Sequence, residues 1–222
     1  MAEKIWKAVD AYYGDLFGLS DPVMAHVLAA SEAGGLPAIQ VSPLQGRQLM
    51  MLAQMSKARR ILEIGTLGGY STIWLARALS SDGSLVTLEF EPRHAKVAQA
   101  NIAHAGFSAQ VEVRLGKAAD SLAAMIAADE EAFDFVFIDA DKQGYPAYLE
   151  ASLKLVRPGT IIVADNMVRE GAVTDAKSRD AAVQGVRRFN EIVAREKRLC
   201  ATAIQTVGEK GYDGFVMARV LT

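Results

Sequence analysis

The hydrophobic positions of the chain fall into short apolar runs separated by longer stretches with helical spacing. Runs of this length, rich in Val, Ile, Leu and Phe, predict buried strands near 60–64, 85–89, 111–115, 134–138 and 160–164. Helical patterns lie between these runs, and strands that alternate with helices indicate a parallel sheet. The sequence therefore predicts a doubly wound α/β fold.

Both ends of the chain depart from this alternation. Three helical patterns precede the first strand, near 3–18, 22–33 and 43–57. The last two strands are separated by a short turn, which implies an antiparallel hairpin, and they are expected near 200–207 and 214–220. We expect a seven-stranded, mainly parallel sheet with this hairpin at its end and helices on both faces.

The composition is that of one globular unit without a strongly charged partner. Of the 222 residues, 51% are hydrophobic, which is enough for a single domain with a sizeable core. We expect one domain over 1–222, in which N-terminal helices (1–57) cover the site of an α/β core (58–222). A formal net charge of -2 argues against nucleic-acid binding, which needs concentrated Lys and Arg.

Other features of the chain bear on its location. The N-terminus begins a charged amphipathic helix rather than a signal peptide, and no apolar run reaches the length needed to span a membrane. Cys200 is the single cysteine, so no internal disulfide can form. We therefore expect a cytoplasmic protein without a membrane partner.

A glycine-rich turn follows the first predicted strand and leads into a helix rich in Leu and Ala. Gly65, Gly68 and Gly69 let the backbone turn tightly and approach a ligand, and Ser71 lies where the helix begins. Glu89 ends the next strand, roughly twenty residues further on, at the distance suited to binding ribose hydroxyls. The glycines alone would also fit a simple tight turn. Together with Glu89 they indicate an adenosine site.

Two common phosphate-binding patterns do not fit this turn. Leu67 stands where a dinucleotide fingerprint requires its second glycine, which argues against pyrophosphate. Gly116 and Lys117 are followed by Ala118, so the P-loop pattern is not met. Glu63, just before the glycines, would repel phosphate but could pair with an ammonium group. S-adenosylmethionine, which joins adenosine to an amino acid, fits these charges.

Carboxylates follow two later strands of the predicted sheet. Asp139 and Asp141 come after the strand at 134–138, and Asp165 and Asn166 come after the next strand. The carboxyl ends of parallel strands share one sheet edge, so these side chains are expected to converge near the adenosine site. Their hard oxygens suit Mg²⁺, or Mn²⁺ or Ca²⁺. In isolation, Asp165 and Asn166 would more often be read as a cap of the following segment.

Four segments of the chain, taken in order, resemble a known family. They are similar, in sequence and in spacing, to segments of the cation-dependent O-methyltransferases of the caffeoyl-CoA and catechol type; here they are Glu63–Ser71, Asp139–Lys142, Ala164–Asn166 and Gly211–Phe215. The resemblance covers nearly the whole chain. It implies a Rossmann-like class I methyltransferase fold, methylation of a hydroxyl on a catechol-like small molecule, and a homodimer.

The resemblance also implies roles for individual residues. Contacts to S-adenosylmethionine would come from Val41, Glu63, Gly65, Thr66, Ser71, Glu89, Ala118 and Asp141. Glu89 would hold the ribose, and Ser71 would help to bind the methionine carboxylate. The metal would be bound by Asp139, Asp165 and Asn166, with Asp139 and Lys142 as the catalytic pair. We hypothesise that Lys142 is the base that takes the proton of the attacking hydroxyl.

Other classes of function stay open at the level of sequence. A nicotinamide-dependent dehydrogenase would share the fold, but the missing second glycine of the turn argues against it. A non-catalytic binding module would share the fold without needing the set of acidic residues. Within methyl transfer, a non-catechol acceptor or a hydroxyl on RNA is an alternative, and the low positive charge disfavours RNA. The polar segment 169–179 is placed to line or cover the acceptor pocket.

Overall fold

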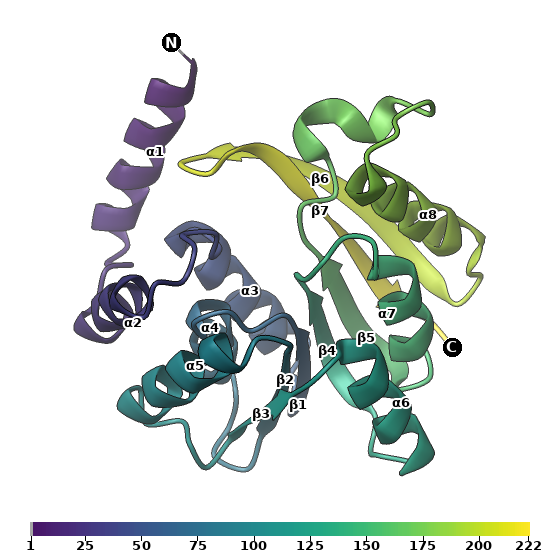
Figure 1. Ribbon diagram of the computed structural model, residues 1–222, viewed down its shortest axis with the longest axis horizontal. Helices are drawn as coiled ribbons and strands as arrows, with labels where there is room; N and C mark the ends of the chain where they lie inside the picture. The colour runs from purple at the N-terminus through teal and green to yellow at the C-terminus, as the bar shows by residue number, and fades with distance from the viewer. Residues whose placement is uncertain (1) are drawn as a thin grey trace.

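A seven-stranded sheet forms the centre of the computed structural model, which describes residues 2–222 (Figure 1). The strands are β1 (Arg60–Ile64), β2 (Ser84–Glu89), β3 (Val111–Leu115), β4 (Phe133–Ile138), β5 (Val156–Ala164), β6 (Leu199–Gly208) and β7 (Gly211–Val220). They lie in the order β3-β2-β1-β4-β5-β7-β6. Strands β1 to β5 are parallel, and β7 runs antiparallel to β5 and β6. The predicted sheet and its antiparallel hairpin are confirmed.

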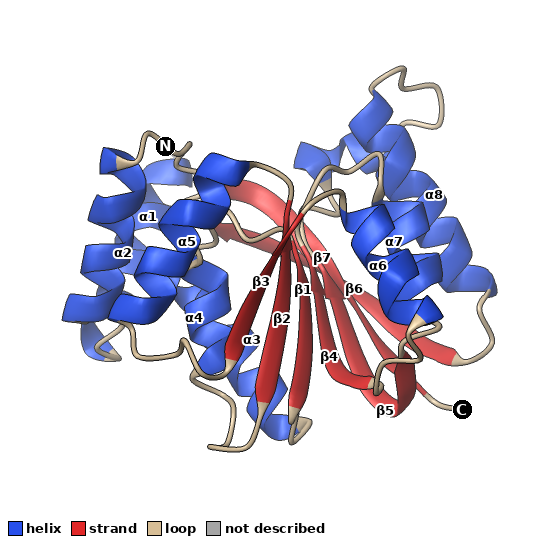
Figure 2. Ribbon diagram, turned by 60° about the horizontal axis from the view of Figure 1, so that its bottom comes forward, coloured by secondary structure: helices blue, strands red, loops and turns tan. Residues whose placement is uncertain are grey.

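Helices cover both faces of the sheet, as expected (Figure 2). The first face carries α1 (Ala2–Leu16), α2 (Pro22–Ala33), α3 (Pro43–Met55), α4 (Tyr70–Ala76) and α5 (Pro92–His104). The second face carries α6 (Ala118–Ala127), α7 (Tyr145–Ser152) and α8 (Ala181–Arg195). Met1, the first residue of the predicted cover (1–57), lies outside the described residues. None of the helices in residues 2–222 combines the length and apolarity needed to cross a membrane.

The central strand β4 shows how the sheet builds two cores. All six of its residues are buried, because helices cover both faces of the sheet. Successive side chains of a strand point to opposite faces, so Phe135 and Phe137 pack against the α2–α5 side, while Val136 and Ile138 pack against the α6–α8 side. This explains why the strand reads as a continuous apolar run rather than an alternating one.

Strand β5 begins at Val156, four residues before the predicted start. The segment Arg157-Pro158-Gly159 suggests a turn from sequence, but Val156 still pairs with Phe133. The register shifts between Phe133 and Phe135, and the Thr160 hydroxyl donates to the Phe133 carbonyl at 2.7 Å. Pairing therefore resumes across a bulge, which a local turn signal cannot reveal.

The C-terminal hairpin is also longer than predicted. Gly208 pairs with Gly211, so Glu209 and Lys210 alone form the turn, in place of the predicted turn over 208–214. The long hairpin reaches beyond the sheet, and its tip lies beside α1 (Figure 1). There the amide of Glu209 donates to Asp10 of α1 at 2.7 Å. The tip thereby connects the last strands to the first helix.

Strand order reverses direction between β1 and β4, and this is the point where open α/β sheets bind ligands. Backbone pairing continues one residue past each strand end there. The amide of Gly65 donates to Leu88 at 3.0 Å, and the amide of Asp139 donates to Ile64 at 2.9 Å. The amide of Asp165 likewise donates to Ile138 at 3.0 Å. The glycine turn and both acidic segments therefore share one edge.

Candidate active site

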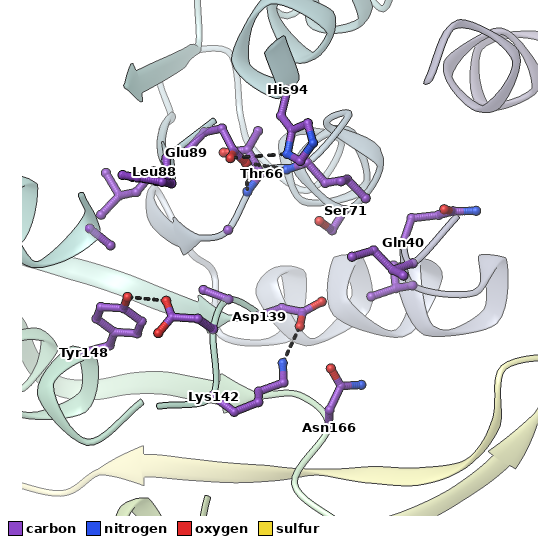
Figure 3. A pocket seen from close by; sticks show the side chains of 18 of the residues that line it. Gln40, Thr66, Ser71, Leu88, Glu89, His94, Asp139, Lys142, Tyr148 and Asn166 are labelled. Carbon is purple, nitrogen blue, oxygen red and sulfur yellow. Dashed lines mark hydrogen bonds and ion pairs between the residues drawn. The ribbon is translucent and has the colours of Figure 1, made fainter. Parts of the chain in front are cut away.

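A cavity of about 870 Å³ lies at this edge of the sheet, and the predicted residues converge on it (Figure 3). The predicted cofactor residues that line it are Val41, Gly65, Thr66, Ser71, Glu89, Ala118 and Asp141. Asp139, Lys142 and Asn166 line it too, and they lie on the opposite side of the view from Thr66 and Glu89. Two predicted residues, Glu63 and Asp165, are buried and are not among the lining residues.

The position directly after β1 requires a glycine, Gly65. Its φ is +100°, and a Cβ atom there would lie 2.0 Å from the Asp139 carbonyl oxygen. No side chain can occupy that space without moving β4 away from β1. The absence of a side chain therefore lets the glycine turn and the acidic segment after β4 approach each other closely.

Glu89 fixes the glycine turn from the neighbouring strand end. One carboxylate oxygen accepts from the amides of Thr66 and Leu67, at 3.2 and 2.8 Å. The other oxygen accepts from the Glu91 amide at 2.9 Å and lies 3.5 Å from Nδ1 of His94. Glu89 thus orients the backbone of the turn and presents its carboxylate at the cavity, where it can accept further hydrogen bonds.

Glu63 lies behind the cavity wall, next to Ser71, which lines the cavity. Its side chain has no solvent exposure, and its oxygens accept from Ser71, Thr72 and Thr87 hydroxyls at 2.6, 2.5 and 2.7 Å. Burial raises the pKa of Glu63 to about 7, although the three hydroxyl donors favour the charged form. The carboxyl group is therefore well supplied with hydrogen bonds yet costly to ionise.

Lys142 is held at the cavity wall by two partners. Its Nζ donates to Oδ1 of Asp139 at 2.8 Å and to the Tyr145 hydroxyl at 2.6 Å. Tyr145 is fully buried, and its hydroxyl lies 3.1 Å from the Ile138 carbonyl and 3.0 Å from the Asp165 carbonyl. The phenol therefore joins the ends of β4 and β5 and orients the lysine that lies between them.

The acidic residues at the ends of β4 and β5 lie close enough for the charge of one to act on the other. Burial, and then the charge of Asp139, raise the pKa of Asp165 to about 7, and the Asn166 amide donates to Asp165 at 2.8 Å. Lys142 supplies one ammonium group to this pair of carboxylates. Two carboxylates and an amide oxygen are hard ligands, and they fit a divalent cation.

The described residues contain no alternative metal centre. Across 2–222, no group of three or more His, Cys, Asp and Glu side chains is arranged to hold a metal ion. The predicted set of Asp139, Asp165 and Asn166 has two such side chains and an amide, so any cation bound there would need further oxygens from water or substrate.

A family model described as O-methyltransferase matches residues 19–220, which is nearly the whole chain. This chain belongs to the O-methyltransferase family. The family expected from the sequence is thereby confirmed, and so is the prediction of a methyl-transferring enzyme. Membership also favours methyl transfer over the dehydrogenase and the non-catalytic module.

Two relatives of this O-methyltransferase align over most or all of their length. A catechol O-methyltransferase of Niastella koreensis is 49% identical over 220 residues, covering 99% of this chain and 100% of that protein. A catechol O-methyltransferase of Mycobacterium tuberculosis is 48% identical over 212 residues, covering 96% and 94%. The matches therefore extend over nearly the whole of this chain.

Solved structures show the same architecture. An O-methyltransferase from Bacillus cereus in complex with SAH superposes with a TM-score of 0.96 at 56% identity, covering 98% of this chain and 99% of that one. TomG, an O-methyltransferase from Streptomyces achromogenes in complex with SAM, gives a TM-score of 0.96 at 47% identity and covers 100% of both chains. The class I methyltransferase fold is therefore confirmed for this chain.

Several residues at the site of this O-methyltransferase are not among the site residues predicted from the sequence. Tyr145 orients Lys142, and the Tyr148 hydroxyl donates to Asp141 at 2.5 Å. His94 and Arg169 line the cavity. A helix pattern beginning near Lys142 could have placed both tyrosines beside the acidic segment, since Tyr145 and Tyr148 lie four and seven residues after Asp141, at a spacing that returns to one side of a helix. No local signal identifies His94, because its contact with Glu89 is made across two elements.

Proposed function

We propose that this protein transfers the methyl group of S-adenosylmethionine to one hydroxyl of a catechol-like small molecule, with the help of a divalent cation. The observation that carries this proposal is the meeting of Asp139, Lys142 and Asn166 in the cavity that the glycine turn enters. The catechol O-methyltransferases among its relatives support the acceptor class. The SAH and SAM complexes of its structural neighbours support the methyl donor.

The methyl donor would lie along the β1 and β2 ends of the cavity. Glu89 would accept from the ribose hydroxyls, and Ser71 would donate to the methionine carboxylate at the start of α4. Ala118 would meet the adenine through its backbone, and Val41, Gly65, Thr66 and Asp141 would complete the binding site, as their positions in the cavity wall support. Glu63 would pair with the donor's ammonium group. The Ser71 hydroxyl now donates to Glu63. It would have to turn toward the methionine carboxylate when the methyl donor binds, which frees a Glu63 oxygen for the ammonium group.

The cation would be held by Asp139, Asp165 and Asn166. When bound, it supplies Lewis-acid activation of a phenol hydroxyl and charge that favours the phenolate. Mg²⁺ is the ion we propose, and Mn²⁺ or Ca²⁺ would accept the same ligands. The proximity of the two carboxylates supports this assignment, since the charge of Asp139 acts on Asp165.

Lys142 would take the proton of the attacking hydroxyl at Nζ. An amine must be neutral to accept a proton, so Nζ would first release one proton to solvent, and its ion pair with Asp139 would open as the ammonium charge is lost. Tyr145 keeps Nζ at the cavity wall after that pair opens, since its hydroxyl contacts Nζ independently of Asp139. We infer that the hydrogen bond between Nζ and the Tyr145 hydroxyl keeps Nζ directed toward the hydroxyl of the methyl acceptor.

We further propose that residues 1–222 act as one cytoplasmic methyltransferase domain in which 1–57 cover the site of the 58–222 core. Within that N-terminal region, Ile39, Gln40 and Val41 line the cavity. Lys210 at the hairpin tip donates to the Ala38 carbonyl at 3.1 Å. This hydrogen bond holds the segment that precedes Ile39, Gln40 and Val41. RNA is not proposed as the acceptor, because the net charge of -2 gives no electrostatic attraction to it.

We infer that the protein is a homodimer and that α1 contributes to its interface. None of the residues of α1 is buried, although Ile5, Val9, Tyr12 and Leu16 form an apolar face along it. The helix lies beside the hairpin tip (Figure 1). A second copy would cover this face. Ile5→Glu combined with Val9→Glu should then give a monomer in sedimentation, with Lys7→Glu as control; a monomeric wild type would contradict the inference.

The proposed function is tested by transfer of labelled methyl from S-adenosylmethionine to 4-methylcatechol, with Mg²⁺ and with excess chelator. We expect methylation that the chelator abolishes and that requires both neighbouring hydroxyls, so 4-methylphenol should not react. Methylation unaffected by chelator would refute the cation. No transfer to any catechol, with intact cofactor binding, would refute the acceptor class.

A further inference from the structure

The loop after β5 adopts a backbone conformation that its side chains disfavour. Arg169 and Glu170 both have φ of +54°, and Gly171 follows with φ of +90°. Left-handed conformations are unfavourable for residues with a Cβ atom, and two in succession are uncommon. Strain of this kind persists where the surrounding structure holds it, and it is concentrated at functional sites.

Strand β7 supplies the contacts that hold this loop. One carboxylate oxygen of Asp213 accepts from the amides of Val168 and Arg169, both at 2.9 Å. The Met167 amide donates to the Gly214 carbonyl at 2.8 Å. A Cβ at Gly214 would lie 2.7 Å from Val168, so the loop packs directly on the strand backbone. Contacts with β7 therefore fix the position of Arg169, against the backbone conformation that a residue with a Cβ atom prefers.

Arg169 contributes a positive charge that the described part of the chain does not neutralise. The residue is half-buried and lines the cavity. Its Nε is buried and has no hydrogen-bond partner within residues 2–222. None of the ion pairs formed by these residues includes Arg169. A buried donor without a partner is costly, so a ligand that supplies an acceptor would be favoured.

The location of Arg169 separates it from the part of the cavity proposed for the adenosine. Arg169 follows the end of β5, whereas Glu89 ends β2, and β1 and β4 lie between those strands. Three strand spacings amount to roughly 14 Å. Asn166, the proposed cation ligand, is only three residues before Arg169. A group bound by Arg169 would therefore belong to the methyl acceptor.

We propose that Arg169 selects methyl acceptors that carry an anionic group, a carboxylate, in addition to the catechol ring. The planar guanidinium fork matches a carboxylate in two parallel hydrogen bonds, and charge-assisted bonds of this kind are among the strongest in proteins. Lys142, the cationic side chain that follows β4, already pairs with Asp139, whereas Arg169, which follows β5, is free of such a pair within residues 2–222. This inference rests on the proposed catechol methylation.

The test compares three acceptors of similar size and different charge: 3,4-dihydroxybenzoate, 4-methylcatechol and dopamine. The wild type should give the highest kcat/KM for the benzoate and the lowest for dopamine. Arg169→Met should lower kcat/KM for the benzoate by about 10- to 100-fold, chiefly through KM, as loss of a charge-assisted hydrogen bond implies. The preference for the benzoate over 4-methylcatechol should disappear. Arg169→Lys should keep part of it, because the charge remains.

The matched control is Arg179→Met. Arg179 is exposed, belongs to the same polar segment and is not among the lining residues, so the same net charge is removed away from the cavity. Its acceptor preference should equal that of the wild type. The lysine variant decides the question independently if the methionine variant unfolds below the assay temperature.

Two results would overturn the inference. A wild type that methylates 4-methylcatechol without preferring the benzoate would refute it while leaving the proposed function intact. An equal loss for all three acceptors in both Arg169 variants would assign Arg169 a structural role. If the wild type methylates none of the three, the proposed function itself fails, and this inference fails with it.

Discussion

Replacing Glu63 by Gln should remove a pH-dependent loss of stability. Glu63 is fully buried, and its pKa is raised from 4.5 to about 7. The folded state therefore holds a proton that the unfolded chain has released between these two values. A raised pKa of this sign stabilises the fold fully below pH 4.5, and the contribution is lost as the pH rises to about 7.

The size of the effect follows from the difference between the two pKa values. From 4.5 to about 7 is a shift of about 2.5 units, and each unit corresponds to about 1.4 kcal/mol. Wild-type stability should thus fall by about 3 kcal/mol, relative to Glu63→Gln, between pH 4.5 and pH 8. The glutamine keeps the size of the side chain and an oxygen for the hydroxyls of Ser71, Thr72 and Thr87, so the difference reports charge.

Urea unfolding measured at several values between pH 4.5 and pH 8, without cofactor and with chelator, provides the assay. The buried Trp74 gives a fluorescence signal for loss of packing. Comparing differences between variants removes contributions from other groups, including Asp165. Glu150→Gln, which changes an exposed carboxylate on α7, should follow the wild type at every pH. The reasoning is wrong if the Glu63→Gln difference stays constant, because the three hydroxyls would then stabilise the charge fully.

Three further predictions concern the strand ends. Gly65→Ala should lower the free energy of unfolding by about 3 kcal/mol, because backbone strain and steric overlap add. Gly171→Ala should lower it by about 1 kcal/mol, because its φ is also positive but no atom lies within 4 Å of the added Cβ. Equal losses in the two variants, measured by chemical unfolding, would contradict this reasoning. Lys142→Met should lower kcat by about 10²- to 10⁴-fold with Mg²⁺ affinity retained, and near-normal turnover would exclude it as the base. Asp139→Ala or Asp165→Ala should weaken Mg²⁺ binding in calorimetry, and unchanged affinity in both would refute the cation site.

Strand identities and the chemistry at strand ends followed from the sequence because they depend on local pattern. The run 134–138 predicted β4 to within one residue, since a strand covered on both faces must be apolar throughout. The sequence predicts that Asp139 and Asp165 lie near each other, because parallel strands end at one edge of a sheet. The glycines of the turn gave their own signal, as few other residues allow such backbone angles.

Tertiary structure decided the features that depend on contacts between distant segments. The start of β5 depends on pairing with Phe133 across a bulge, which overrides the turn signal of Pro158 and Gly159. Whether Glu63 lines the cavity or lies behind it could not be told from its place on β1, because the three hydroxyls around it come from two other elements. The hydrophobic pattern of a strand predicts which face of the sheet a side chain lies on, but not which groups of other elements it contacts there.

Arg169 shows the same division most clearly. The sequence placed a polar segment after the predicted cation ligands, and so predicted that it lines or covers the pocket. Its conformation is decided by Asp213, which lies more than forty residues further along the chain and accepts from two loop amides. Local preference opposes the left-handed backbone that results, so only the packed fold can stabilise it. The sequence by itself determined which chemistry is present, and the tertiary structure decided where each group points because that depends on contacts made after folding.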